Sequence, residues 1–355
     1  MHICNIFTGG TIGSTLDNDG YISTSTETVY QLLDAYKNQY SCTHTMENYN
    51  PYTILSENLD ANHLLKLINT VALKLDEGFD GIIIMHGTDT LQYSAAILSI
   101  VFNDIPIPII FVSSDYILSD SRANGIINYH YAIRFLEDYY KNKILCNNLY
   151  HNSLYNNTLY GTHHVFVSYQ NKGELPTIHC ADMLQPPVPY SADVKSILNN
   201  YIGMYTLDEK EDYIPNVPFN STCSILKSME SFHNLFQLPL CIVRKDYTHI
   251  QLNPCAAIMR IQPSPGLTFC DITTDTNVII METYHSGTFL TNEAFFAFAK
   301  KAKNLNIPIL LTGLNSQEKS YETVKNYVKA NIIPVYDTAV IALYCFLWLA
   351  FSNPN

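Results

Sequence analysis

Residues 3–13 read Ile-Cys-Asn-Ile-Phe-Thr-Gly-Gly-Thr-Ile-Gly, an apolar run that passes directly into a glycine-rich turn. Residues 81–90 repeat the arrangement, with Gly-Ile-Ile-Ile-Met followed by His-Gly-Thr-Asp-Thr. Short apolar runs that end in such turns and precede helical periodicity are typical of βα units around a parallel sheet. Because ligands of open α/β sheets bind beyond the carboxyl ends of the strands, the same turns indicate where a site would lie.

Further apolar runs and helical patterns extend this α/β prediction along the chain. Additional strands are expected at 107–112, 256–261, 278–281 and 308–311, and helices at 62–75 and 292–303. The apolar stretch Ala339–Phe351 has thirteen residues, fewer than the roughly 20 that cross a bilayer, so a buried helix is expected there.

The 355 residues exceed one typical core and favour two domains. We expect an N-terminal domain at 1–190, a linker and insertion at 191–254, and a C-terminal α/β domain at 255–355. Prolines at 186, 187 and 189 mark the first break. The Asn- and Tyr-rich segment 145–164 is interpreted as a loop or hairpin.

The net charge of −12 argues against nucleic acid or an anionic membrane as the main partner, because both attract clustered cations. The nine cysteines lack CxxC spacing, and we expect them to be reduced thiols rather than disulfides. No signal peptide is visible at the N-terminus, so a cytoplasmic location is expected. The adjacent His163 and His164, together with the lack of an HExxH motif, predict no metal site.

Taken alone, the two turns allow both structural and catalytic interpretations. The first lacks the lysine and spacing of phosphate-binding loops. In the second, Thr88 beside Asp89 could bind an amine or activate a hydroxyl, or serve only as a helix cap.

Together, residues 8–12 and 86–90 resemble the two signature motifs of the L-asparaginase/glutaminase family of threonine amidohydrolases, and the cytoplasmic (type I) asparaginases most closely. Gly20-Tyr21, Ser56-Glu57 and Ser113-Ser114 resemble further segments of that family. The resemblance implies a larger N-terminal, mainly parallel sheet flanked by helices, a smaller C-terminal α/β domain, and no cofactor. It also implies an amino-acid substrate and a homodimer or homotetramer.

The resemblance also assigns roles to residues. Thr11 would attack the side-chain amide of L-asparagine or a related carboxamide, Tyr21 would close over the site, and Thr88 would assist as a second hydroxyl. Asp89, the fourth residue expected to be catalytic, would hold the substrate ammonium. The remaining substrate contacts would come from Gly10, Ser56, Glu57, Gly87 and Ser114.

One departure concerns the family's catalytic lysine, whose position is occupied here by Ile178. An isoleucine cannot accept a proton. His179 or Lys172 could substitute as the base, since histidine titrates near neutral pH. Alternatively, the protein could be an inactive relative that binds an amino acid as a sensor, or the alignment of this segment could be displaced.

Overall fold

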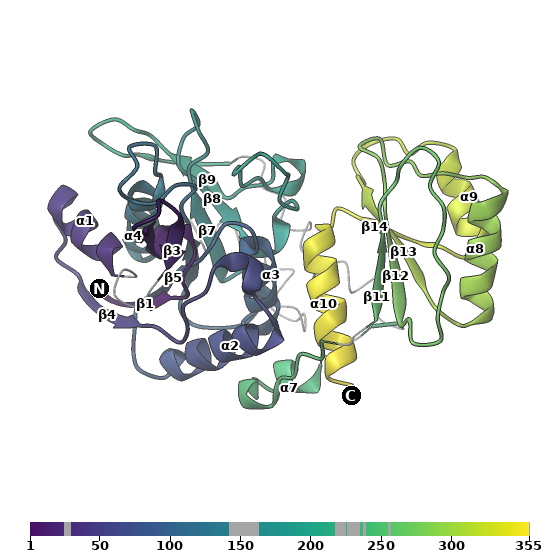
Figure 1. Ribbon diagram of the computed structural model, residues 1–355, viewed down its shortest axis with the longest axis horizontal. Helices are drawn as coiled ribbons and strands as arrows, with labels where there is room; N and C mark the ends of the chain where they lie inside the picture. Colours follow the sequence, from purple (N-terminus) through teal and green to yellow (C-terminus); the bar gives the residue numbers. More distant parts are fainter. Residues whose placement is uncertain are drawn as a thin grey trace.

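The computed structural model of the chain describes residues 1–24, 30–141, 163–216, 225, 235–236, 239–254 and 257–354. Two lobes, each built on one sheet, lie side by side with helix α10 (Val340–Ser352) between them (Figure 1). The N-terminal lobe carries the larger sheet. This confirms the predicted α/β class and the division into a larger and a smaller sheet.

The large sheet has eight strands in the order β10-β9-β8-β7-β6-β5-β1-β4. Neighbours from β4 to β7 run parallel, whereas β8, β9 and β10 are added in antiparallel fashion. The strands are β1 His2–Phe7, β4 Thr45–Tyr49, β5 Gly81–Met85, β6 Ile109–Val112, β7 Val165–Tyr169, β8 Thr177–Cys180, β9 Gly203–Tyr205 and β10 Tyr213–Pro215. A separate hairpin joins β2 (Ser14–Leu16) to β3 (Ile22–Thr24).

Alternating side chains of the central strands enter two cores, as the two-residue period of a strand requires. In β5, Ile82 and Ile84 join the core shared with α2 (Ala61–Leu75) and α3 (Leu91–Val101). The opposite core, with Ile83 and Met85, also contains residues of α1 (Gln31–Gln39) and α4 (Gly125–Lys141). Helices therefore cover both faces, which explains the continuous apolar runs.

The small sheet has four parallel strands in the order β11-β12-β13-β14. They are β11 Ile258–Ile261, β12 Val278–Glu282, β13 Ile309–Leu314 and β14 Ile333–Tyr336, and helices α8 (Glu293–Asn304) and α9 (Thr323–Lys329) pack on one face. The other face shares a core with α10 and the large lobe, through Val278, Ile280 and Leu310. One apolar core thus joins the two lobes.

Several predicted elements are confirmed, including the strands near 3–7, 81–85 and 107–112 and the helices near 62–75 and 292–303. Asp60 and Asn292 cap α2 and α8 by accepting backbone N–H groups, which defines where these helices begin. The stretch Ala339–Phe351 forms the buried helix α10. Among the residues described, no helix combines the length and apolar character needed to span a membrane.

The segment 191–254, expected as a linker and insertion, supplies β9 and β10 to the large sheet, which therefore extends to Pro215. It also contains the short helices η4 (Ile197–Asn199), α7 (Leu240–Val243) and η7 (Tyr247–His249). Most of the Asn- and Tyr-rich segment 145–164 lies outside the described residues, as does Ala256, the first residue of a predicted strand.

Candidate active site

The two glycine-containing turns meet where β1 and β5 end, because these strands are parallel neighbours. Gly10 has a φ of 77°, and a Cβ on it would lie 2.3 Å from the Cα of Gly87. A Cβ on Gly87 would lie 2.4 Å from the Cβ of Ser56. Side chains at either glycine would therefore overlap their neighbours, so glycine is required at both positions.

The Ser56 segment is attached to both turns by hydrogen bonds. Ser56 Oγ donates to Asp89 Oδ2 at 2.9 Å, and Thr90 Oγ1 donates to the Ser56 carbonyl at 3.0 Å. The backbone N–H of Gly10 donates to the Ile54 carbonyl at 2.9 Å. Four predicted site residues, Gly10, Ser56, Gly87 and Asp89, are thus brought together by contacts between segments far apart in sequence.

Thr11 opens the short helix η1 (Thr11–Gly13) and is half-buried. The turn that contains it is held by two hydrogen bonds to the Gly10 carbonyl, one from the Gly13 N–H and one from Ser14 Oγ. Thr11 is therefore a partly exposed residue on a fixed turn next to the glycine contact. That placement suits a nucleophile, which needs both access and a defined position.

His86 fixes the peptide bond that precedes Thr88. Its Nδ1 lies 2.9 Å from the Gly87 carbonyl and its Nε2 lies 2.8 Å from Ser94 Oγ. Burial lowers the pKa of His86 to about 4, so the ring is neutral near pH 7. Since a carbonyl only accepts, Nδ1 carries the proton. In a trans peptide the Thr88 N–H then points away from His86, and none of the described residues accepts a hydrogen bond from it.

A cavity of about 460 Å³ lies against Thr88 and Asp89. Gln92 of α3 and the loop 187–194 complete its lining. Asn171 holds this loop in place, because it accepts a hydrogen bond from the Val194 N–H at 2.8 Å and donates one to the Val194 carbonyl at 3.0 Å. Our sequence reasoning missed both the loop and Asn171, which are joined to the site only by long-range contacts.

Tyr21 lies between β2 and β3, and 73% of its surface is exposed. Its backbone N–H donates to Asp17 Oδ1 at 2.8 Å, which stabilises the turn of the hairpin. Within the described part of the chain, its hydroxyl makes no hydrogen bond to Thr11. The structure therefore does not bring Tyr21 to the predicted nucleophile.

Two predicted substrate contacts lie in different surroundings. Ser114 is fully buried, and its Oγ donates to the Tyr116 carbonyl at 2.6 Å and accepts from the Gly125 N–H at 3.1 Å. Its hydroxyl thus stabilises the turn before α4. Glu57, by contrast, is exposed on η2 (Ser56–Asn58) beside the buried Ser56.

The region expected to supply a base is apolar or distant. Ile178 is buried in β8 opposite Ser168, in the core shared with α4. His179 faces the other way, with Nδ1 2.9 Å from Ser196 Oγ, and burial lowers its pKa to about 3. Lys172 borders a different cavity of about 440 Å³, together with Asp115 and Arg122. Neither His179 nor Lys172 lines the cavity that contains Thr88.

Known proteins provide an independent comparison. Residues 2–148 match the family model described as "Asparaginase, N-terminal". A curated relative, a glutamyl-tRNA(Gln) amidotransferase component from Methanosarcina mazei, is 38% identical over 130 residues, which cover 36% of this chain and 30% of the relative. The chain therefore matches less than a third of the length of this relative.

Two solved structures align over the whole chain. The thermostable L-asparaginase of Thermococcus kodakarensis has a TM-score of 0.67 at 18% identity and is covered over 94% of its length. L-asparaginase I of Vibrio cholerae has a TM-score of 0.63, also at 18% identity, and is covered over 93%. At this identity the alignments establish a shared fold.

Proposed function

We propose, from the premise that residues 2–148 match the asparaginase N-terminal family model and that the chain has the fold of two L-asparaginases, that this protein is a threonine amidohydrolase. Its reaction is hydrolysis of the side-chain amide of L-asparagine, or of a related small carboxamide, to the carboxylate and ammonia. The observation that carries the proposal is the convergence of the Thr11 turn, Ser56 and the Thr88–Asp89 turn at adjacent strand ends.

In the first step, Thr11 Oγ attacks the carboxamide carbon and its proton passes to the amide nitrogen, which leaves as ammonia. The acyl group remains on Thr11 as an ester. Water then attacks the ester carbon, releases the carboxylic acid and restores the hydroxyl. The Thr88 N–H, oriented through His86, supports the developing oxyanion, because preorganised donors stabilise charge that forms in the transition state.

The α-amino group of an amino-acid substrate is bound by Asp89, whose carboxylate is exposed beside the cavity and oriented by Ser56. A carboxylate that accepts from an ammonium forms a strong, charge-assisted contact. Closure of the β2–β3 hairpin would bring Tyr21 to Thr11 and exclude water. We further propose a cytoplasmic homodimer or homotetramer as the working form.

A second candidate function is amino-acid binding without rapid turnover. It is favoured by the surroundings of Ile178 and His179, where the position assigned to the catalytic lysine is part of an apolar core. A ring with a pKa of about 3 is a weak base, so His179 would accept the Thr11 proton poorly. In this case the Ser56–Asp89 side of the site would still recognise an amino acid.

The decisive experiment compares the wild-type chain with Thr11→Val, which removes the hydroxyl and keeps a branched side chain of similar size. Ammonia release is measured with L-asparagine and with L-glutamine, because relatives of this chain are named as components of a glutamyl-tRNA(Gln) amidotransferase. An amidohydrolase should lose turnover by about 10³-fold or more in Thr11→Val. Equal, negligible ammonia release by both proteins would reject the proposal that the chain is an amidohydrolase.

Calorimetric titration with L-aspartate separates the second candidate from a protein with neither function. Binding to wild type and to Thr11→Val, without ammonia release by either, would establish a binding protein. An Asp89→Asn variant is the matched control, since it removes the charge that should recognise the ammonium. No heat of binding to the wild type would contradict both candidates.

A further inference from the structure

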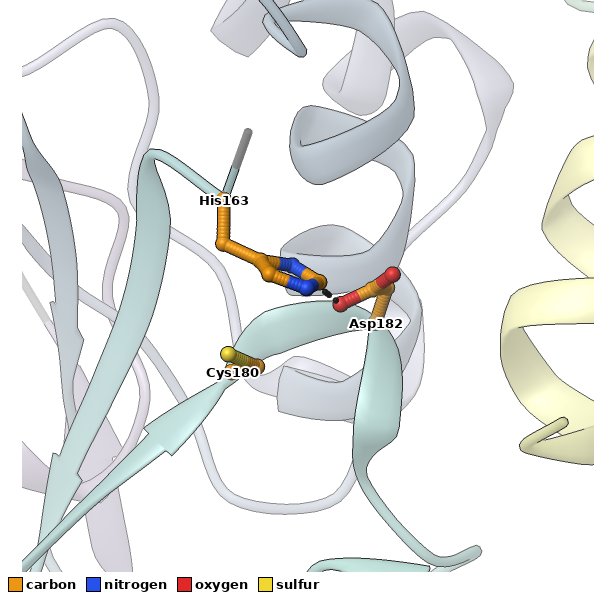
Figure 2. A group of neighbouring side chains, drawn as sticks. All are labelled: His163, Cys180 and Asp182. Atoms are coloured by element: carbon orange, nitrogen blue, oxygen red, sulfur yellow. Dashed lines mark ion pairs between the residues drawn. The ribbon is translucent and has the colours of Figure 1, made fainter. Parts of the chain in front are cut away.

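Three buried side chains meet at one end of the β7–β8 pair, outside the candidate active site. His163 precedes β7, Cys180 is the last residue of β8, and Asp182 lies in η3 (Ala181–Met183). The antiparallel register pairs Phe166 with Cys180, so the start of one strand lies beside the end of the other. Figure 2 shows the His163 ring and the Asp182 carboxylate turned toward each other, with Cys180 close by.

The distances between the donor atoms are short. His163 Nδ1 lies 3.2 Å from Asp182 Oδ1, and the ligand atoms of all three side chains lie within 4.8 Å of one another. Bonds of 2.0–2.3 Å at tetrahedral angles put the ligands of a zinc ion roughly 3.3–3.8 Å apart. The His163–Asp182 separation is close to that range, and an adjustment of about 1 Å at most would place the sulfur within it.

The chemistry of the set also suits a metal. An imidazole nitrogen, a thiolate and a carboxylate are the three ligand types that zinc uses in proteins. All three residues are at least nine-tenths buried, with exposures of 8%, 0% and 1% for His163, Cys180 and Asp182. Within the described ranges, this is the one group of three His, Cys, Asp or Glu side chains whose donor atoms come so close together.

We propose that His163, Cys180 and Asp182 form a structural binding site for a divalent transition-metal ion of the zinc type. A fourth donor, which a water or another side chain supplies, would complete a tetrahedron. The sequence predicts no metal because its histidines and cysteines lack the short spacings of metal motifs, whereas these three ligands are joined by strand pairing. The proposal does not depend on the amidohydrolase activity.

The position of the site indicates what the metal would do. Helix η3 packs against α3 and β7, and the chain continues from it into the loop that lines the Thr88 cavity. An ion bound by His163, Cys180 and Asp182 would cross-link the N-terminal part of η3 to the start of β7. The site is therefore expected to fix the base of that loop rather than to touch a substrate.

The first test is the metal content of the intact wild-type chain. The purified protein is loaded with ZnCl₂, passed through a desalting column and measured by elemental analysis, and a Co²⁺-loaded sample is examined by absorption spectroscopy. We expect about one ion per chain and a sulfur-to-cobalt charge-transfer band, which reports a thiolate ligand. Absence of the bound ion or of the band would overturn the proposal.

The second test locates the ion with variants, titrated with Zn²⁺ against a chromophoric chelator. Cys180→Ser and Asp182→Asn should each weaken zinc binding by at least about 10-fold. Cys4→Ser is the matched control, because Cys4 is equally buried but lies in the core shared with α2. Wild-type affinity in both ligand variants would place the ion elsewhere and overturn the proposal. If one variant does not fold, the other decides.

Discussion

Two strand pairs of the large sheet, named here the β1–β5 side and the β7–β8 side, differ in what they contribute to the candidate site. On the β1–β5 side, glycine contacts and hydrogen bonds hold Gly10, Ser56, Gly87 and Asp89 together. On the β7–β8 side, the position assigned to a catalytic lysine is a buried isoleucine, and the neighbouring histidine is bonded to Ser196 within the fold. One side has the geometry of a binding site, and the other has the packing of a core.

This contrast predicts that substrate recognition and proton transfer depend on different parts of the fold and can be changed separately. The parts that would orient a substrate depend on close backbone approach, which tolerates few changes. The part that would supply a base depends on one side chain, which can be replaced by an apolar one wherever the core accommodates it. Substitutions on each side can therefore test the contrast separately.

The largest effect is expected when a lysine is placed at position 178. Ile178→Lys should lower the free energy of unfolding by about 4 kcal/mol, because a charge without a partner would be buried in the core shared with α4. Urea-induced unfolding measures it. The control is Ile22→Lys, since Ile22 is 49% exposed and its replacement should change stability by less than about 0.5 kcal/mol.

The same variant can break the comparison. Suppose that Ile178→Lys folds with wild-type stability and raises ammonia release. Position 178 would then face the active site, and the β7–β8 side would differ from a catalytic one only by the absence of the lysine side chain. We expect neither result, because Ile178 pairs with Ser168 within the sheet, whereas Thr88 borders the cavity beyond β5.

The next largest effect tests the glycine contact. Gly10→Ala should lower the free energy of unfolding by about 3 kcal/mol, since its Cβ would overlap the Gly87 backbone. Gly20→Ala is the matched control: its φ of 84° is similar, but no atom lies within 4 Å of the added Cβ. Its cost should be about 1 kcal/mol. Thermal unfolding of both variants tests the difference, and equal losses would show that backbone conformation alone matters.

A third prediction concerns pH. The folded chain keeps His179 neutral down to its pKa of about 3, whereas the unfolded chain protonates it below about 6.5. The unfolded state therefore binds more protons between these values, and stability falls as the pH falls. Between pH 7 and pH 5 this histidine should account for about 2 kcal/mol of lost stability.

Urea unfolding at the two pH values measures this loss. His179→Asn should reduce it, because asparagine can still bond to Ser196 but does not titrate. His285→Asn, at an exposed position, is the control substitution. If His179→Asn instead removed an inflection near neutral pH from the rate of ammonia release, His179 would be acting as the base, and the contrast between the two sides would fail.

Sequence reasoning succeeded where a local motif and sheet geometry coincide. The turns after β1 and β5 are short-range features, and parallel neighbours necessarily bring their ends together. It could not find Asn171 or the loop 187–194, because their hydrogen bonds join residues more than twenty positions apart. Nor could it decide which way Ile178 and His179 face, since a shift of one residue in register exchanges the two sides of a strand.

The smallest effect should distinguish two neighbours on η2. Ser56→Ala keeps the Cβ that contacts Gly87 but removes the hydrogen bond to Asp89, so Asp89 would lose its orientation. Binding of L-aspartate should weaken by about 10-fold, the value of one hydrogen bond to a charged group. Glu57→Gln should change the affinity less than about 2-fold, because its side chain is exposed. Calorimetric titration of Ser56→Ala and Glu57→Gln with L-aspartate measures both changes in affinity. A larger loss in Glu57→Gln would mean that a second carboxylate binds the ammonium, and that recognition extends from the buried turn contact to the surface of η2.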